Sequence, residues 1–169
     1  MTKMRLTAFP IIIIAFIITL ASCRRDDIEH QNTYMKTGIV LSGAQETPAT
    51  PVSGLGSMDV SYSRLSKTLS YTVRWSGLTG PVTGMHIHGL DPVGFSHPSN
   101  IFQTFTLTAI VPCKVNNVPG PTSCGSYTGT LFIDGVAIKE ADLLNAMYYV
   151  NIHTTAYSGG EIRGQVKFE

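Results

Sequence analysis

Three histidines are the residues of this sequence best suited to chemistry. His86 and His88 are separated by one residue, and His153 lies farther along the chain, just before a glycine-rich stretch. Residues i and i+2 of a β-strand share a face, so the first two imidazoles point the same way. Neutral imidazoles are ligands of copper and zinc. If the strands that carry these histidines are neighbours, the sequence predicts a copper or zinc site with a fourth position for water or substrate.

The same three histidines fit a second interpretation, in which they are surface residues hydrogen-bonded to neighbours such as Asn151 or Glu161. The metal site, for its part, has a weak similarity to copper-zinc superoxide dismutases, which also use a His-x-His strand and a later histidine on a β-barrel. The histidine- and aspartate-rich loop that binds their zinc is missing from this sequence, where His97 is the sole candidate in that region. Dismutase activity is therefore not expected, and no catalytic residues are assigned.

A second polar set consists of Glu46, Glu161 and Arg163. Two carboxylates and an arginine could serve as a catalytic acid, base and clamp. We favour a structural role, because the planar guanidinium holds a carboxylate from Glu46 or Asp142 bidentately and would pin the last strand to a loop. The sequence thus predicts a structural ion pair within this set.

The first 22 residues are expected to be a lipoprotein signal peptide. Lys3 and Arg5 precede an apolar run over residues 11–20, which is short for a membrane span of about 20 apolar residues. The following Leu-Ala-Ser-Cys resembles the lipobox of bacterial lipoproteins, in which the cysteine is lipidated. We expect Cys23 to carry the lipid and to anchor the chain to a membrane, with a free Cys23 after ordinary secretory cleavage as the alternative.

The rest of the chain divides into a tether and one domain. Residues 23–36 are polar and charged without hydrophobic periodicity, which is typical of a flexible tether. Residues 37–169 are long enough for a single domain with a sizeable core. Lys and Arg total 12 against 11 Asp and Glu, and this near-neutral balance argues against a nucleic-acid partner.

Cys113 and Cys124 remain once Cys23 is assigned to the lipid. A chain that has left the reducing cytosol favours a disulfide between them. Two metal-binding thiolates are the alternative, but the close Cys-x-x-Cys spacing is missing.

Alternating apolar and polar residues predict about eight short strands. The clearest patterns are near residues 58–63 and 69–75, which should form a hairpin through residues 64–67, and others fall near 37–41, 82–89, 101–111, 126–133, 148–153 and 161–168. In the last strand, Glu161, Arg163, Gln165 and Lys167 are expected to point outward. One short helix is expected near residues 139–146. The fold class predicted is all-β, an antiparallel β-sandwich or Greek-key barrel with one short helix in a connection.

Three blocks of sequence resemble the CHRD (chordin) domain, over roughly residues 37–168. They are the stretch 41–48 (LSGAQETP), the stretch 76–82 (SGLTGPV) running into the His-Ile-His-Gly of residues 86–89, and the segments 149–154 (YVNIHT) and 159–165 (GGEIRGQ). The family is described as a β-rich module named for repeats in chordin proteins, which bind bone morphogenetic proteins, and in bacteria it occurs in exported proteins. The sequence departs from the family pattern in the Cys113–Cys124 insertion and in His97-Pro98.

Two functions are compatible with these features. The first, which we favour, is a non-enzymatic module, lipid-anchored at the bacterial cell envelope, that binds an envelope protein or polysaccharide. We expect it on the outer membrane, facing the periplasm or the surface. The second is a copper- or zinc-binding periplasmic or surface protein that uses His86, His88 and His153, with redox activity as a further option.

Overall fold

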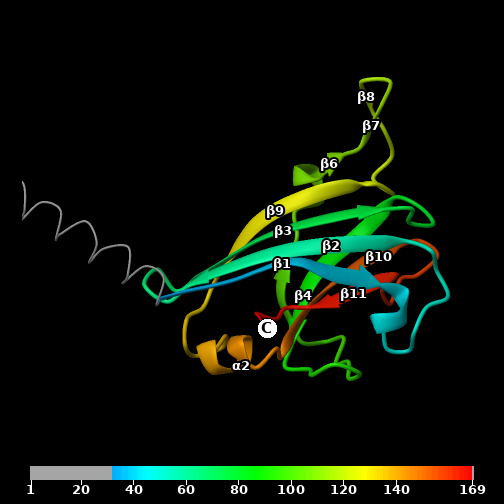
Figure 1. The fold of residues 1–169 in the computed structure, drawn as a ribbon. Helices are drawn as coiled ribbons and strands as arrows, with labels where there is room; N and C mark the ends of the chain where they lie inside the picture. Colours follow the sequence, from blue (N-terminus) through cyan, green and yellow to red (C-terminus); the bar gives the residue numbers. More distant parts are fainter. Residues whose placement is uncertain (1–31, 169) are drawn as a thin grey trace, which may run out of the picture. The chain divides into compact units, whose positions relative to one another are not determined.

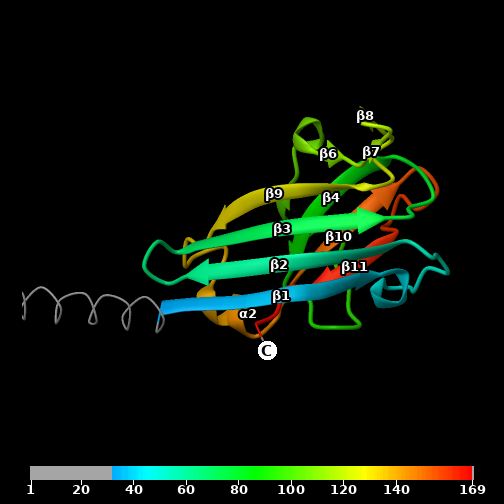
Figure 2. The same cartoon turned by 45° about the horizontal axis from the view of Figure 1, so that its top comes forward.

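The computed structural model describes residues 32–168, except for the side chains of residues 115 and 119, and this part of the chain is built on one antiparallel sheet. Nine strands follow the order β5-β4-β10-β11-β1-β2-β3-β9-β6. Their bounds are β1 Thr33–Ser42, β2 Leu55–Ser63, β3 Thr68–Ser76, β4 Val82–Gly89, β5 Ile101–Thr104, β6 Val111–Pro112, β9 Gly125–Phe132, β10 Tyr148–Thr154 and β11 Ile162–Gln165. The sheet curls into a half-barrel, so that β4 and β10 cross behind β2 and β3 (Figures 1 and 2). The predicted all-β antiparallel class is confirmed.

The β2–β3 hairpin forms as the alternating pattern predicts. Leu55 pairs with Ser76 and Ser63 with Thr68, with the turn at residues 64–67 between them. Leu55 at the start of β2 is 55% exposed, and the alternating apolar residues that follow it in the two strands are at most 3% exposed: Met58, Val60, Tyr62, Leu69, Tyr71, Val73 and Trp75. The same alternation turns Met85 and Ile87 of β4 into the core, where both are fully buried. Because side chains alternate between faces, the histidines of β4 must project from the opposite face.

The predicted strand at residues 101–111 is broken in the structure. β5 ends at Thr104, Phe105 turns into the core with 2% exposure, and a 3₁₀ turn covers Leu107–Ala109 before β6. Beyond β6, the predicted disulfide between Cys113 and Cys124 is present, with Cα atoms 5.3 Å apart. It closes a small ribbon of β7 (Lys114–Val115) and β8 (Val118–Pro119), which projects from the sheet (Figure 1).

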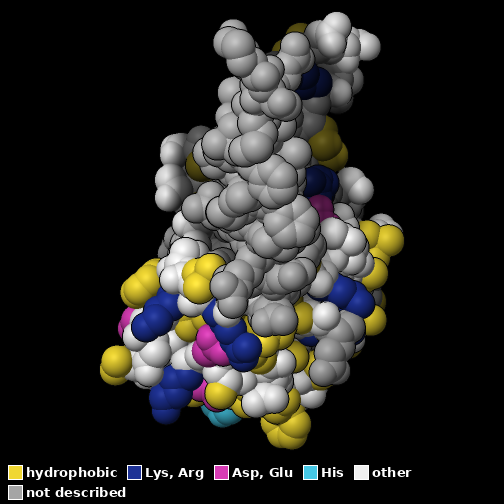
Figure 3. All heavy atoms as spheres, turned by 60° about the vertical axis from the view of Figure 1, so that its left-hand side comes forward, with side chains coloured by type: hydrophobic (Ala, Val, Ile, Leu, Met, Phe, Trp, Pro, Cys, Tyr) yellow, Lys and Arg dark blue, Asp and Glu magenta, His cyan; other side chains and the backbone are white. Residues whose placement is uncertain are grey.

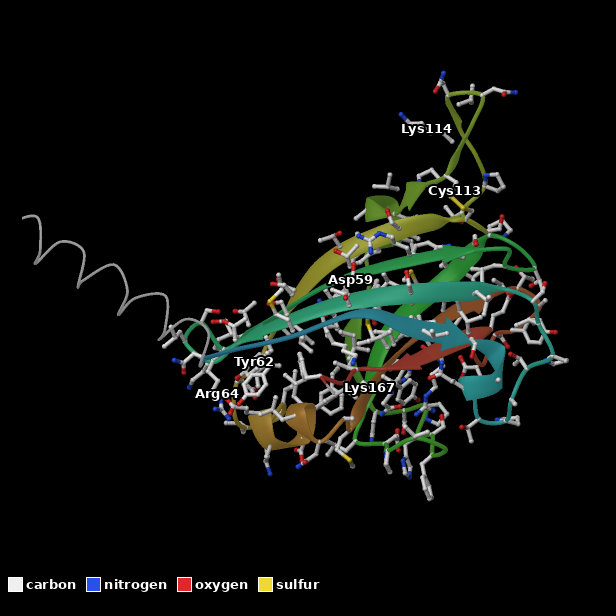
Figure 4. All side chains as sticks on the ribbon, viewed as in Figure 1. Asp59, Tyr62, Arg64, Cys113, Lys114 and Lys167 are labelled. Atoms are coloured by element: carbon white, nitrogen blue, oxygen red, sulfur yellow. A yellow bond between two sulfur atoms is a disulfide. The ribbon has the colours of Figure 1, made fainter. Side chains whose placement is uncertain are left out.

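Helix α2 (Glu140–Leu144) is the short helix that the sequence predicts. Glu140 fixes it to β2, because its carboxylate accepts a hydrogen bond from Tyr62 Oη at 2.8 Å and pairs with Arg64 Nε at 2.7 Å. Figure 4 labels Tyr62 and Arg64 beside this helix. Burial and the neighbouring Glu140 raise the pKa of Tyr62 to about 12. On the face that Figure 3 shows, Lys and Arg side chains lie close to Asp and Glu side chains.

The outward face of β11 is not open to solvent, which corrects one expectation from the sequence. Glu161 is fully buried, Arg163 is 1% exposed and Gln165 is 4% exposed, whereas Lys167 is exposed as expected. Residues of the β4–β5 connection cover this face, since Arg163 donates to Phe95 O and Gln165 donates to Asp91 O. This polar layer continues to the histidines of β4.

The predicted signal peptide and the predicted lipid-bearing Cys23 lie outside the described residues. β1 begins at Thr33, so it includes the last residues of the segment predicted to be a tether. Within residues 32–168, no helix is long and apolar enough to cross a membrane.

Candidate metal centre

The strands that carry the three histidines are neighbours, as the predicted site requires. β4 and β10 pair antiparallel, with His86 opposite Asn151, His88 opposite Tyr149 and His153 opposite Gly84. In this register His153 lies diagonally across from His86 on the same face of the sheet. Diagonal neighbours on one face are within reach of long side chains.

The predicted convergence of the three imidazoles is confirmed. His86 Nδ1 lies 2.9 Å from His153 Nε2, and one ring nitrogen from each of the three residues falls within 4.8 Å of the others. Zinc–nitrogen distances of about 2.0–2.1 Å place two ligands of a tetrahedral ion about 3.3 Å apart. The separations in the structure lie on either side of this value, so small side-chain rotations would bring the three nitrogens to one ion.

The protonation of His153 follows from its backbone partner. Nδ1 of His153 lies 2.9 Å from the carbonyl oxygen of Ser158, which can only accept a hydrogen bond. The proton of the neutral ring therefore belongs on Nδ1, and Nε2 keeps its lone pair. A hydrogen bond of this kind, from the second ring nitrogen to a carbonyl, is common behind metal-ligating histidines.

His88 is the most unusual member of the cluster. It is 3% exposed, and neither Nδ1 nor Nε2 has a hydrogen-bond partner in the described part of the chain. Burial, reinforced by the positive charge that His86 and His153 can carry, lowers the pKa of His88 to about 4, against the opposing effect of the Asn151 side chain, which lies close by without a hydrogen bond of normal geometry. The ring is therefore neutral at physiological pH, which is the form that binds metals.

The other two histidines share this preference for the neutral form. Burial lowers the pKa of His86, and the neighbouring His153 lowers it further. Burial also lowers the pKa of His153, against the opposing effect of its hydrogen bond to Ser158. His153 Nε2 additionally lies 2.9 Å from Asn151 Oδ1, so one of the two neighbours named in the second interpretation does contact a histidine. The carboxylate of the buried Glu161 accepts hydrogen bonds from Thr79 and Thr154, not from the histidines.

The predicted ion pair among Glu46, Glu161 and Arg163 does not form. Ion pairs in the described residues are Arg64–Glu140, Arg74–Asp59 and His97–Asp91. Arg163 instead donates to Phe95 O at 2.7 Å and to Gln165 Oε1 at 3.1 Å, because the β4–β5 connection places a carbonyl where the sequence suggested a carboxylate. Glu161 accepts from Thr79 N and Oγ1 and from Thr154 Oγ1.

Glu46 is a buried carboxyl close to this polar layer. It is 9% exposed, and its Oε1 has no hydrogen-bond partner among the described residues. Burial raises the pKa of Glu46 to about 7, although the positive charge of Arg163 and the backbone N–H of Thr47 both act to lower it. Gly160 makes this position possible, since a Cβ there would overlap the Glu46 carboxyl.

Sequence reasoning missed two residues of the polar layer. Asp91, fully buried, accepts hydrogen bonds from the backbone N–H and the ring Nδ1 of His97. His97 therefore belongs with Asp91, outside the cluster of three histidines. An Asp-Pro pair marks only a turn, so the sequence held no sign of this role. Asn151 was also missed as a site residue, although Asn151 and His153 have the same i, i+2 spacing as His86 and His88.

Fold and site together define a class: an antiparallel all-β domain whose sheet presents three convergent histidines on two neighbouring strands. The family model of the CHRD domain matches residues 37–166. The chain therefore belongs to the CHRD domain family, as its sequence blocks indicated. Comparisons with curated proteins and with solved structures gave no match.

Proposed function

We propose that this CHRD domain is a binding module whose ligand is a copper or zinc ion, held by His86, His88 and His153. The single observation that carries the proposal is His88, a buried side chain whose two ring nitrogens have no hydrogen-bond partner among the described residues. A buried polar group without a partner costs about 1–3 kcal/mol. Departures of this kind from the rules of stable folding are expected at functional sites.

The surroundings of His88 support a metal ligand. Two further imidazoles lie within reach, all three favour the neutral form, and His153 directs the lone pair of Nε2 into the cluster. In the metal-free protein, His86 Nδ1 donates its proton to His153 Nε2 across 2.9 Å. An ion bound between these nitrogens takes the place of that proton, which moves to Nε2 of the same neutral ring, so the ion binds without a net release of protons.

The proposed place of action is the bacterial cell envelope. The sequence indicates a lipid on Cys23, on the outer membrane and facing the periplasm or the surface, and the disulfide between Cys113 and Cys124 supports a compartment outside the reducing cytosol. Mass spectrometry of the mature protein tests this part: a chain that begins at an acylated Cys23 supports it, and an unmodified Cys23 contradicts it.

Metal uptake is tested on the full chain, purified in detergent, stripped with a chelator, loaded with Cu(II) or Zn(II) and desalted. We expect one ion per chain by elemental analysis. His88→Ala and His88→Leu should abolish this uptake, whereas His97→Gln, at an exposed histidine outside the cluster, should retain it. Metal-free H88L should be at least as stable as the wild type, because leucine removes an unpartnered buried polar group. Wild-type protein without metal, or uptake unchanged in H88L, contradicts the proposal.

A second candidate function is recognition of an envelope protein. This is one of the two partners expected from the sequence, the other being a polysaccharide. The observation in its favour is the β4–β5 connection, which exposes Leu90, Val93 and Phe95 by 42%, 70% and 61%. Exposed apolar side chains held by a rigid polar base are typical of protein contacts. Cross-linking from position 93 in cells should capture one defined partner in wild-type protein, and less of it in Phe95→Ser.

A further inference from the structure

We propose that Asn151 Oδ1 is the fourth donor of the histidine site, which then offers a divalent ion three imidazole nitrogens and one amide oxygen. This inference rests on the proposed function, because it completes the same site. Asn151 lies on β10 between the buried Val150 and Ile152, and it pairs with His86 across the β4–β10 ladder. Its side chain therefore leaves the sheet on the same face as the three histidines.

The position of the amide oxygen is that of a ligand. Asn151 Oδ1 lies 2.9 Å from His153 Nε2, and His86 Nδ1 lies 2.9 Å from that same nitrogen. Asn151 is 3% exposed, so the amide is held in this place by protein and not by solvent. The Asn151 oxygen and the two ring nitrogens thus come together from three different side chains.

Hydrogen bonding within the protein does not satisfy this arrangement. Ring atoms of His153 face an oxygen on both sides, Ser158 O at Nδ1 and Asn151 Oδ1 at Nε2. A neutral imidazole carries one proton and can donate to only one of them. With the proton on Nδ1, neither Nε2 nor Oδ1 can donate across their 2.9 Å contact, and a cation bound by both atoms converts this repulsion into attraction.

Glu46 explains why the amide does not turn around. Its carboxyl and the Nδ2 of Asn151 both lie against Gly160, in the space that a Cβ would occupy. A reversed amide would direct Oδ1 toward the Glu46 carboxyl, whose ionised form repels that oxygen, so the ionised carboxyl favours the observed orientation. Glu46 is thus a positioning residue for Asn151, in the manner of the outer partners that orient metal ligands.

The completed donor set narrows the choice of metal. An amide oxygen is a hard ligand, and soft Cu(I) prefers sulfur, whereas three imidazoles with one oxygen suit Zn(II) and Cu(II). Four donors also match the tetrahedral preference of zinc. The site should therefore favour Zn(II) and Cu(II) over Cu(I).

The test compares Asn151→Ala and Asn151→Asp with matched changes at the exposed Asn100, using the full chain in detergent. Zn(II) affinity is measured by competition with a chromophoric chelator, and bound Cu(II) is examined by electron paramagnetic resonance. We expect N151A to weaken Zn(II) binding at least about tenfold, and N151D to restore the affinity and change the parallel g and hyperfine values. N100A and N100D should alter neither.

Two results would overturn the inference: an unchanged Zn(II) affinity in N151A, or a Cu(II) spectrum unchanged between wild type and N151D. The second would restrict Asn151 to a structural contact with His153. Thermal unfolding of each metal-free variant identifies any loss of Zn(II) affinity that comes from misfolding. If N151A is misfolded, the comparison of the Cu(II) spectra of wild type and N151D decides the inference. If the wild type binds no metal, the proposed function fails first, whereas wild-type uptake with an inert Asn151 refutes only the fourth donor.

Discussion

The guanidinium carbon of Arg163 lies 3.4 Å from the centroid of the Tyr149 ring, directly over its face. The opposite side of Tyr149 stacks on His88, with centroids 5.0 Å apart and ring planes 12° apart. A cation over an aromatic face is attracted to the ring, and more strongly when both are removed from water. The metal ligand His88 is thereby supported by a buried stack that ends at the β4–β5 connection.

Replacing Arg163 with lysine should destabilise the protein by about 2–4 kcal/mol, because lysine lacks the planar fork that stacks on Tyr149 while donating to Phe95 O and Gln165. Urea unfolding measures the change. Arg74→Lys is the matched control, since Arg74 pairs with Asp59 at the surface and such pairs contribute about 0–1 kcal/mol. Equal losses in the two variants would mean that the stack has no energetic role.

Glu46→Gln should change how stability depends on pH. The pKa of Glu46 is about 7 in the folded protein, above the ordinary 4.5 of the unfolded chain. The folded state therefore retains the proton longer, so the stability from this group is complete below pH 4.5 and is lost as pH rises through 7. One pKa unit corresponds to about 1.4 kcal/mol, which gives a loss of about 3 kcal/mol.

Glutamine mimics the protonated carboxyl, so E46Q should be more stable than the wild type at pH 8 and similar to it at pH 4.5. Chemical unfolding at both pH values, in buffer with a chelator, checks the prediction. If the wild type is as stable as E46Q at pH 8, or more stable, then ionisation of Glu46 does not destabilise the folded protein, and the prediction is wrong.

Glu161→Gln should have the opposite effect. The fully buried Glu161 carboxylate accepts from Thr79 N at 2.8 Å, Thr79 Oγ1 at 2.6 Å and Thr154 Oγ1 at 2.5 Å. Hydrogen bonds to a charged group contribute about 1.5–3 kcal/mol each, and an amide keeps only one of the two acceptor oxygens. We expect E161Q to lose about 2 kcal/mol at pH 7 by urea unfolding, and an unchanged stability would show that these hydrogen bonds have no net energetic role.

Removing the disulfide should reduce stability without affecting the metal site. The bond between Cys113 and Cys124 closes a loop with a sequence separation of 11, for which the chain-entropy relation gives about 3 kcal/mol. The double variant Cys113→Ser, Cys124→Ser should unfold at lower urea concentration and still bind one Zn(II). Loss of zinc binding in a folded double variant would contradict the independence of the two features.

Local patterns predict much of this fold, and long-range contacts explain what they miss. Met85 and Ile87 are buried as alternation requires, and the spacing of His86, His88 and His153 leads to a real cluster. Arg163 could not be placed correctly, because its burial depends on the β4–β5 connection, some 70 residues earlier in the chain. The break after Thr104 is of the same kind, since Phe105 leaves the strand to fill the core.

Candidate site residues without a recognisable motif were equally hard to predict. Asn151 between two apolar residues looks like any outward polar residue of a strand. Its spacing from His153 is visible in the sequence, but its place opposite His86 requires the β4–β10 register. The burial of His88 depends on the Tyr149 ring that stacks on it. The strand pattern indicates only that residue 149 is aromatic, not which side chain it covers.

The central claim, that His86, His88 and His153 bind one ion together, is tested most directly by ¹⁵N NMR of the histidine rings in the full chain during titration with Zn(II). Single histidine variants assign the signals. We expect the signals of ring nitrogens in these three residues to shift together and to saturate at one equivalent of zinc, while His97 and His30 keep their shifts. Zinc-dependent changes confined to His97 or His30, or no changes at all, would contradict it.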